Sequence, residues 1–366
     1  MSPLAARVSD PMIHGQPDTV GEIAPSFYGF SRPRLAERLA GMGVPGYRAD
    51  QLFAWVYQKH RRSAEAMTNL PAALRREFAA VCHLRLPSSE VFASRDGQTR
   101  KFVLTLDDGA RVESVSMRTP KRLTFCVSSQ VGCALSCRFC ATGLMGLQRN
   151  LTADEIVAQV VTMGDAEQWQ DERFNIVFMG MGEPLANLGA VAESIRILHD
   201  GRGLNLGARR ITVSTSGLVP QIRELGAMGL AVGLAVSLHA TTDELRTELM
   251  PVNKRWPLEE LLDAARDYGV SVGRRVTLEY TLLGGVNDTP ADADRLAQFA
   301  RRLPSKVNLI PYNPVPGLPW KRPSPEAVDA FAARLYPHAP AVTVRNTMGG
   351  EIWAACGQLG GLSPSV

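Results

Sequence analysis

The sequence has no apolar run long enough to span a bilayer, and its first residues do not resemble a secretory signal. A membrane protein is therefore not expected, and the cytoplasm is the expected location. No internal repeat is visible. Neither sign of charge is in large excess, since 40 Lys and Arg against 36 Asp and Glu give a formal net charge of +4. That balance permits an RNA partner but does not require one.

Cysteine is scarce, with six in 366 residues, and a cytosolic chain of this length is not expected to hold a structural disulfide framework. Cys126 and Cys356 are far apart in sequence, and Cys82 is interpreted as a structural residue. The other three lie close together, at Cys133, Cys137 and Cys140. So tight a group favours metal binding.

The length and a hydrophobic content of 45% suit one large domain, or a large domain with a small one. The expected divisions are a flexible tail at 1–28, a helical accessory domain at 29–86, a β-hairpin extension at 87–120, a barrel at 121–348 and a C-terminal loop at 349–366. The tail is expected because its Pro, Gly, Ser, Asp and His residues follow no periodicity.

Apolar residues from Arg34 to about Phe78 recur at helical spacing. The same stretch is dense in basic residues, namely Arg48, Lys59, Arg61, Arg62, Arg75 and Arg76. Two interpretations of these charges are open: an ordinary solvated face, or a basic surface that touches RNA phosphates.

Three short strand signals follow, at Val91–Ser94, Lys101–Leu106 and Val112–Met117. They are separated by Asp96-Gly97 and Asp108-Gly109. Asp-Gly between alternating runs favours hairpin turns, so these runs predict the β-hairpin extension.

From Lys121 onward, strand and helix patterns alternate. The strand candidates are Leu123–Val127, Asn175–Met179, Ile211–Ser214, Ala235–Leu238, Val276–Tyr280 and Lys306–Ile310. Thr152-x-x-Glu155 is a capping box that opens one helix, and Ser324-Pro325 opens another. Six such units predict an α/β fold, with a parallel sheet curled into a partial (β/α)6 barrel. The site is expected at the carboxyl ends of its strands.

The segment Cys133-Ala-Leu-Ser-Cys137-Arg-Phe-Cys140 places three thiolates on one short loop. Thiolates suit iron–sulfur clusters, and three of them leave one corner of a four-iron cluster without a protein ligand. That open iron can chelate a small molecule. Structural zinc is the alternative. A structural zinc site normally has four protein ligands, usually arranged as two separated pairs, and the sequence has no second pair of cysteines at that spacing. The sequence therefore predicts a [4Fe-4S] cluster.

The spacing of these cysteines, with Phe139 before the last one, resembles the signature of the radical S-adenosylmethionine (SAM) superfamily. The resemblance implies that the open iron binds the amino and carboxyl groups of SAM. An electron from the cluster then breaks a sulfur–carbon bond of SAM and yields a 5′-deoxyadenosyl radical.

An ordered set of motifs over roughly residues 32–360 carries a closer resemblance. The set consists of Thr124-Phe-Cys126-Val-Ser-Ser-Gln-Val-Gly-Cys133, Phe139-Cys140-Ala-Thr-Gly143, Gly180-Met-Gly-Glu183-Pro184, Ser214-Thr-Ser-Gly217, Ser237-Leu238-His239-Ala240, Pro311-Tyr312-Asn313-Pro314 and Ala354-Ala355-Cys356-Gly357-Gln358-Leu359. It resembles the bacterial adenine-C2 RNA methyltransferases of the RlmN type, which act on 23S rRNA and some tRNAs.

The SAM contacts that this resemblance implies are Gly182, Glu183, Ser214, Ser237, Leu238, His239 and Asn313. The residues themselves supply part of the reason. Glycine after a strand lets a ligand approach the backbone, and a carboxylate there can accept the ammonium group of SAM. Taken singly, Glu183 could equally be a surface carboxylate in a tight turn, and His239 would more often be a satisfied structural histidine.

Adenine C2 is an electron-poor carbon that cannot attack the methyl group of SAM, whereas a carbon radical can add to it. The resemblance implies that one SAM methylates Cys356 and that a second SAM supplies the radical, so two are used per turnover. It implies that Cys126 is the resolving thiol, which frees the RNA through a transient disulfide with Cys356. Glu113 is the implied proton acceptor, although by itself it could be any glutamate on an edge strand.

The approach to Cys356 departs from the resembled family in two places. The family often has arginine where Met348 stands and aspartate where Glu351 stands. The carrier cysteine is intact, so the difference bears on local loop contacts, possible RNA contacts included, rather than on the reaction.

Three other functions stay open. A sister group methylates adenine C8 with the same cysteines, a non-catalytic iron–sulfur or zinc protein could bind RNA, and a radical SAM enzyme could act on a small molecule. The last two of these functions would leave Cys126 and Cys356 without a role. The expected partners are 23S rRNA, tRNA and an electron donor such as flavodoxin, with no membrane, and the chain is expected to be monomeric.

Overall fold

The computed structural model describes residues 24–169 and 172–360. Most of the predicted tail at 1–28 and the end of the predicted loop at 349–366 therefore lie outside the described residues. Within the described ranges, no helix is both long and apolar enough to cross a bilayer.

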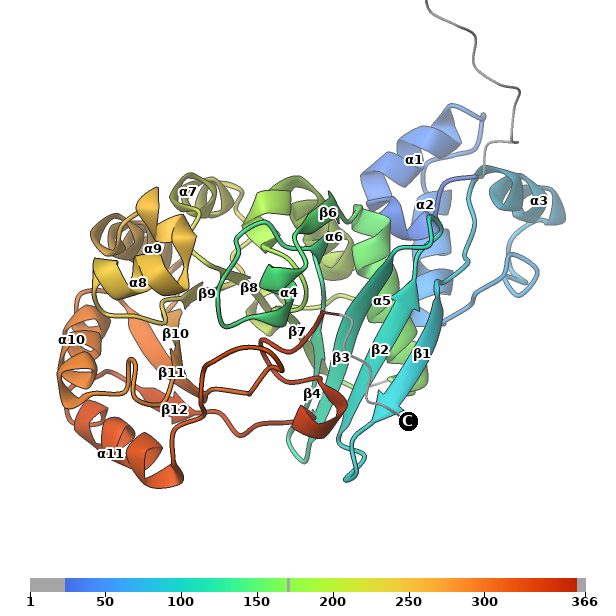
Figure 1. Ribbon diagram of the computed structural model, residues 1–366. Helices are drawn as coiled ribbons and strands as arrows, with labels where there is room; N and C mark the ends of the chain where they lie inside the picture. Colours follow the sequence, from blue (N-terminus) through green and yellow to red (C-terminus); the bar gives the residue numbers. More distant parts are fainter. Residues whose placement is uncertain (1–23, 170–171, 361–366) are drawn as a thin grey trace, which may run out of the picture.

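A ten-stranded sheet organises the fold (Figure 1), in the order β1-β2-β3-β4-β7-β8-β9-β10-β11-β12. The strands are β1 (Ser88–Ala93), β2 (Thr99–Thr105), β3 (Arg111–Thr119), β4 (Arg122–Cys126), β7 (Phe174–Phe178), β8 (Ile211–Thr215), β9 (Gly233–Ser237), β10 (Val276–Leu282), β11 (Ser305–Pro311) and β12 (Val342–Val344). The pairs from β1 to β4 are antiparallel, and every pair from β4 to β12 is parallel. The parallel part is the partial barrel that the sequence predicts.

Helices connect the parallel strands and cover the outside of the sheet (Figure 1). They are α5 (Ala153–Ala166), α6 (Leu188–His199), α7 (Val219–Ala227), α8 (Asp243–Leu249), α9 (Leu258–Val272), α10 (Pro290–Arg301) and α11 (Pro325–Leu335). Both predicted helix starts are confirmed. Thr152 and Glu155 form a capping box at α5, and the Ser324 hydroxyl accepts the N–H of Ala327 at α11.

Two features of the sheet differ from the sequence predictions. β12 is a seventh parallel strand that the patterns did not predict, because three residues are too few to show a period. The runs predicted as a hairpin extension form β1, β2 and β3, and β3 pairs directly with β4. Since β3 is an interior strand of the large sheet, the interpretation of Glu113 as an edge-strand residue is wrong.

The N-terminal region is helical, as predicted, with the turn η1 (Phe27–Gly29) and the helices α1 (Arg32–Ala40), α2 (Arg48–Phe53) and α3 (Ala72–Val81). Its core is a group of aromatic side chains whose ring centroids lie 5.3–6.4 Å apart, namely Phe27, Tyr28, Phe53, Tyr57 and Phe78. This group belongs to the same apolar core as the barrel, because η1 packs on α5.

Arg62 ties the N-terminal helices to the barrel. Its guanidinium donates to the carboxylate of Asp165 on α5, with N–O distances of 2.6 and 2.8 Å. Because this charge is already paired inside the protein, Arg62 links the two regions and is less available to RNA phosphates than an unpaired arginine. Arg61 is exposed, and Arg48 stacks over the ring of Tyr47 at the surface.

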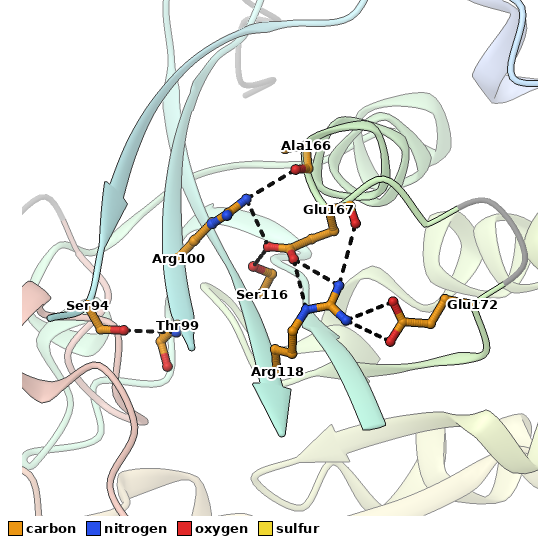
Figure 2. A network of polar contacts seen from close by, with 8 residues as sticks. All are labelled: Ser94, Thr99, Arg100, Ser116, Arg118, Ala166, Glu167 and Glu172. Carbon is orange, nitrogen blue, oxygen red and sulfur yellow. Dashed lines mark hydrogen bonds and ion pairs between the residues drawn. The ribbon is translucent and has the colours of Figure 1, made fainter. Parts of the chain in front are cut away.

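A second charged network fixes the end of α5 against the sheet (Figure 2). Arg118 of β3 pairs with Glu167 at 3.2 Å and with Glu172 at 2.8 Å. Ser116 donates a hydrogen bond to Glu167 at 2.7 Å, and Arg100 of β2 pairs with the same carboxylate at 3.5 Å. The arginines of β2 and β3 in this network are thus neutralised by carboxylates of the protein itself.

A two-stranded ribbon, β5 (Gln130–Gly132) with β6 (Leu147–Asn150), stands outside the large sheet. It brackets the cysteine segment and the short helix α4 (Ala141–Leu144). The N–H of Cys133 donates to the Gly146 carbonyl at 2.9 Å, which ties the two ends of the cysteine segment together.

Candidate active site

The cysteine segment forms a tight loop next to the carboxyl ends of the barrel strands. The N–H of Cys140 donates to the Cys137 carbonyl at 3.2 Å, and the N–H of Arg138 donates to the Leu249 carbonyl at 2.9 Å. Gly143 is required here, because a Cβ at this position would lie 2.8 Å from the Cys137 carbonyl oxygen. The chain therefore folds back on itself and holds its three thiols together.

The three thiols of the loop are free and close enough to influence one another. Burial and then the neighbouring thiols raise the pKa of Cys137, and burial raises the pKa of Cys133 to about 11. Among the described residues, no group of three or more His, Cys, Asp or Glu converges as a single metal ion requires. A cluster sets a different requirement, because each thiolate binds a different iron.

A polar side chain beside the loop also fits a bound group. The Tyr312 hydroxyl is buried in the wall of the adjoining cavity, where the backbone of Val315 lies close to its oxygen, and within the described part of the chain no acceptor is found for its proton. Buried polar groups are normally satisfied, so this hydroxyl suits a ligand atom in the cavity. Three soft donors together with this hydroxyl fit a cluster and a small polar molecule beside it.

A cavity with about 840 Å³ of empty space lies next to the cysteine loop. Cys137 and Cys140 line it on one side. The predicted SAM contacts that line it are Gly182, Glu183, Ser214, Ser237, His239 and Asn313, which come from the ends of β7, β8, β9 and β11. Leu238 does not line it, since its side chain is fully buried in the core and its N–H donates to the Glu279 carbonyl at 3.0 Å.

Glu183 is a fixed acceptor in the cavity wall. Its carboxylate accepts the N–H of Ser216 at 2.7 Å and the N–H of Leu185 at 3.0 Å. Burial raises the pKa of Glu183, and these hydrogen bonds oppose the rise. The side chain is 3% exposed, so the interpretation of Glu183 as a surface carboxylate is wrong. An oriented carboxylate of this kind can bind an ammonium group.

The glycines beside Glu183 serve packing within the protein. A Cβ on Gly180 would lie 2.6 Å from the Ser128 hydroxyl, and a Cβ on Gly182 would lie 2.5 Å from the Cβ of Gln130. Gly182 also has a φ of +96°, which favours glycine. These glycines therefore make room for the chain that leads into the cysteine loop, and both also line the cavity.

His239 is both a structural residue and part of the cavity wall. Its Nδ1 accepts the N–H of Thr281 at 3.0 Å, and its ring packs edge-on against Phe139. Burial, with Arg246 nearby, lowers the pKa of His239 to about 3, so the ring is neutral at physiological pH. Because Nδ1 accepts a hydrogen bond, the proton of the neutral ring is on Nε2, where it can be donated to a ligand.

Asn313 holds the backbone of Cys356. Its Nδ2 donates to the Cys356 carbonyl at 3.1 Å, while its Oδ1 accepts from Thr347 at 2.9 Å and from Arg322 at 3.2 Å. Both ends of the amide are thus engaged within the protein. Asn313 therefore positions the C-terminal segment in addition to lining the cavity.

Three further hydrogen bonds attach the residues after Cys356. They join the Ala141 N–H to the Gly357 carbonyl at 2.8 Å, the Thr142 hydroxyl to the Leu359 carbonyl, and the Gln358 side chain to the Pro314 carbonyl at 2.9 Å. In Figure 1 this segment, drawn in red, runs from β12 across to the strands β4 and β3. Cys356 consequently lines the same cavity as the cysteine loop.

Cys126 lies at the end of β4, where it neighbours both Cys356 and the guanidinium of Arg345. Burial raises the pKa of the Cys126 thiol to about 12, and Cys356 adds to the rise. Cys356 is in turn the main cause that raises the pKa of Arg345. All six cysteines are free thiols, so the disulfide expected between Cys126 and Cys356 is not formed in this structure.

Glu113 contacts the segment that carries Cys356. Its carboxylate accepts the N–H of Gly360 at 3.4 Å and pairs with the ammonium of Lys101 at 3.7 Å. Both side chains of this ion pair are buried, and burial lowers the pKa of Lys101 while Glu113 opposes the change. The structure therefore places Cys126 beside Cys356, and Glu113 beside Gly360, four residues after Cys356, although Glu113 itself does not line the cavity.

Comparison with known proteins identifies the family. Residues 26–84 match the ribosomal RNA large subunit methyltransferase N-terminal domain, and residues 127–299 match the radical SAM superfamily. The probable dual-specificity RNA methyltransferase RlmN of Symbiobacterium thermophilum is 51% identical over 90% of this chain and 90% of its own length. The dual-specificity RNA methyltransferase RlmN of Geobacter sulfurreducens is 48% identical over 91% of each chain. This chain belongs to the RlmN family of radical SAM RNA methyltransferases.

A solved structure agrees with this placement in the RlmN family. The crystal structure of a radical SAM methyltransferase from Sphaerobacter thermophilus superposes with a TM-score of 0.87 and 48% identity, covering 92% of this chain and 99% of that chain. Membership in the RlmN family implies a [4Fe-4S] cluster, SAM as cofactor and an RNA substrate.

Sequence reasoning missed three charged residues of this RlmN family member, namely Lys101, which pairs with Glu113, and Glu279 and Arg345, which line the cavity with Cys356. Glu279 on β10 is 4% exposed, accepts from Asn308 at 2.8 Å and lines the cavity. The alternation of polar residues along Val276–Leu282 was the signal that could have found it. Lys101 and Arg345 gave no such signal, because a charge in a short strand normally faces solvent.

The two departures from the family pattern have separate surroundings. Glu351 accepts the N–H of Arg95 at 3.2 Å, which links the C-terminal segment to the turn between β1 and β2. Met348 lines a second, larger cavity of the barrel. Neither residue contacts the cysteine loop through any hydrogen bond among the described residues.

Replacing Cys133, Cys137 or Cys140 by Ala, one at a time, should abolish SAM cleavage, because each thiolate fixes one iron corner of the cluster. The measurement is iron and sulfide content after anaerobic purification, together with 5′-deoxyadenosine formed from SAM under a reductant. Cys82→Ala is the matched control, since Cys82 is buried in the helical region, and it should keep both. An intact four-iron cluster with unchanged 5′-deoxyadenosine formation in a loop variant would contradict the assignment.

Proposed function

We propose that this chain methylates C2 of a specific adenosine in 23S rRNA, and of the adenosine 3′ to the anticodon in some tRNAs. The observation that supports this most is the place of Cys356, with the cysteine loop on one side and Cys126 with Arg345 on the other. An enzyme that moved a methyl group directly from SAM to RNA would need neither of the two remote cysteines.

When bound, the cluster supplies the electron that splits SAM into methionine and a 5′-deoxyadenosyl radical. The walls of the cavity determine how SAM lies there. We assign Glu183 to its ammonium group, because the Glu183 carboxylate is already held in one orientation by two backbone N–H groups. The Nε2 proton of His239 and the residues Gly182, Ser214 and Ser237 complete the proposed contacts, with Leu238 contributing only backbone.

Cys356 is the proposed carrier of the methyl group. Substitution at sulfur needs a thiolate, and the guanidinium of Arg345 lies beside Cys356 in the wall shared with the SAM cavity. Asn313 fixes the Cys356 carbonyl, so the cysteine stays in the wall of the SAM cavity. One SAM loads the methyl group and a second activates it, which makes two per turnover.

Glu113 and Cys126 act after the activated carbon has joined adenine C2. The ring carbon must then lose its hydrogen as a proton, and the Glu113 carboxylate, held by Lys101 and Gly360, is the proposed acceptor. Cys126 then frees the RNA: its sulfur bonds to that of Cys356, the bond between the Cys356 sulfur and the methylene carbon breaks, and that carbon takes up the proton of the Cys126 thiol. The unpaired electron of the adduct leaves to a one-electron acceptor in the same step. A thiol reductant has to restore both thiols before the next turnover, and the structure corresponds to this reduced state.

Two alternatives are weighed by specific observations. A C8-specific methyltransferase would use the same cysteines, and the naming of relatives at 48–51% identity as RlmN favours C2 instead. A non-catalytic iron–sulfur RNA-binding protein would have no use for Cys126, Cys356 or the SAM cavity. An electron donor such as flavodoxin and a monomeric state remain part of the proposal.

Anaerobic reaction of the reconstituted protein with SAM, a reductant and unmodified 23S rRNA or tRNA should yield 2-methyladenosine in both RNAs. The measurement is chromatography with mass spectrometry of the digested nucleosides, which separates 2-methyladenosine from 8-methyladenosine. An 8-methyladenosine product would assign the chain to the sister activity. Zinc without iron or sulfide in the anaerobic protein would support the non-catalytic alternative.

The two remote cysteines should fail at different steps. Cys356→Ala should stop the reaction at its start, because no methyl group is loaded and no adduct can form. Cys126→Ala keeps the carrier, the cluster loop and the SAM cavity, so RNA should accumulate covalently bound through Cys356. A denaturing gel of each variant, with and without nuclease, distinguishes the two. Normal turnover by Cys126→Ala without trapped RNA would exclude the two-cysteine mechanism, and RNA trapped by Cys356→Ala would reverse the assigned roles.

A further inference from the structure

A second cavity lies inside the barrel, on the other side of Cys356 from the SAM cavity. Its empty space, with the open solvent at its mouth included, is about 2040 Å³, compared with about 840 Å³ for the first on the same measure. The two cavities share a short stretch of wall, made by Met179, Glu279, Ile310, Asn313, Arg345 and Cys356. Cys126 opens only to the second cavity. Cys356 thus lies between two cavities, and no ligand has been assigned to the second.

The inward-facing positions around this second cavity are polar. Sheet register places Thr124 opposite Asn175, and Asn308 opposite Thr343, with all four side chains in the cavity wall. A small barrel with no ligand inside is normally filled by branched apolar side chains. A roomy interior lined by hydroxyl and amide groups instead suits a polar molecule that enters the barrel.

The entrance to this cavity is basic. Parallel strands begin on the same side of a sheet, and basic residues stand where five of them begin, at Lys121, Arg122, Arg173, Arg209, Arg210, Arg274, Arg275 and Lys306. Four of these residues, Arg122, Arg209, Arg210 and Lys306, line the cavity itself. We call these four the basic rim. Three of the four are exposed, and Arg210 is half-buried.

Among the described residues the basic rim forms no ion pair, although Glu279 in the same cavity wall interacts electrostatically with Lys306. Within residues 24–169 and 172–360, no Asp or Glu lies within ion-pair distance of Arg122, Arg209, Arg210 or Lys306. The neighbouring network in Figure 2 differs from the basic rim, because its arginines are paired. There Glu172, just before β7, pairs with Arg118. An unpaired group of cations at the mouth of a polar cavity suits an anionic ligand.

We propose that the second cavity receives the target nucleotide extruded from RNA, with its base beside Cys356 and its phosphates at the basic rim. This inference rests on the proposed function. Enzymes that modify a base take it out of the stack into a pocket, and the SAM cavity is committed to SAM. Ile310 in the shared wall lies four residues after Lys306 along β11. The distance between the rim and the shared wall is therefore about 13 Å at the usual rise per residue of a strand. Phosphate at the rim and base at the wall therefore match the two ends of the cavity.

The test is the affinity of the cluster-loaded protein for a tRNA transcript, measured over a range of salt concentrations. Arg209→Ala/Lys306→Ala is the variant of choice, because both side chains are exposed and form no hydrogen bond or ion pair among the described residues. Its affinity should fall roughly tenfold, and the slope of log K against log salt should shrink by about 2, one unit for each phosphate that is no longer neutralised. Its RNA KM should rise more than its kcat falls, since these side chains bind RNA without reacting with it.

Arg223→Ala is the matched control, because Arg223 is an exposed arginine on the outer helix α7, away from both cavities. It should leave the affinity and the salt slope at wild-type values. Arg48→Ala/Arg61→Ala tests the competing docking surface on the N-terminal helices. Iron content and thermal midpoint check the fold of every variant.

The outcomes separate the proposals from one another. If the Arg209→Ala/Lys306→Ala variant kept the wild-type affinity and salt slope, the basic-rim assignment would be overturned. A lower affinity and a smaller salt slope in Arg48→Ala/Arg61→Ala would strengthen that conclusion. A wild-type protein that bound no RNA at any salt concentration would instead overturn the proposed function, and the basic-rim assignment with it.

Discussion

The attachment of the C-terminal segment to the barrel is the constraint on which the site depends. In the proposed function one sulfur, that of Cys356, has to reach SAM, RNA and a second thiol, and a fixed backbone keeps it within reach of all three. The Asn313 amide, the Ala141 N–H and the Gln358 side chain each contribute one hydrogen bond to this attachment. Bonds of this kind contribute about 0.5–1.5 kcal/mol each, so several are needed to hold a segment without regular secondary structure.

The mixed sheet explains how so many different groups reach one sulfur. Its parallel strands end at the cysteine loop and present Glu183 and His239 to the SAM cavity, as strand ends do in barrels. Its antiparallel strands extend the same surface sideways and bring Glu113, with its buried partner Lys101, to the segment just after Cys356. In the proposed function the radical source and the proton acceptor therefore come from the two halves of one sheet.

Much of this arrangement follows from the sequence, and the part that does not has a common cause. The cysteine loop, the helix starts at Thr152 and Ser324, and the strand runs are local patterns, which local physics determines. The positions of the buried Lys101 and the half-buried Arg345 depend on partners distant in sequence, so no local pattern reveals them. The same holds for Asn313, whose amide turned out to hold Cys356, and for Arg62, whose partner Asp165 lies on another element.

The central claim is that the methyl group reaches RNA through Cys356, and label transfer tests it most directly. The protein is first loaded with a trideuterated methyl group from labelled SAM, freed of that SAM, and then given RNA, unlabelled SAM and a reductant for a single turnover. The account predicts an RNA methyl group with two deuterium atoms, because one is removed when the methyl group is activated on the sulfur. An unlabelled methyl group on RNA, with the label still on the protein, would contradict it.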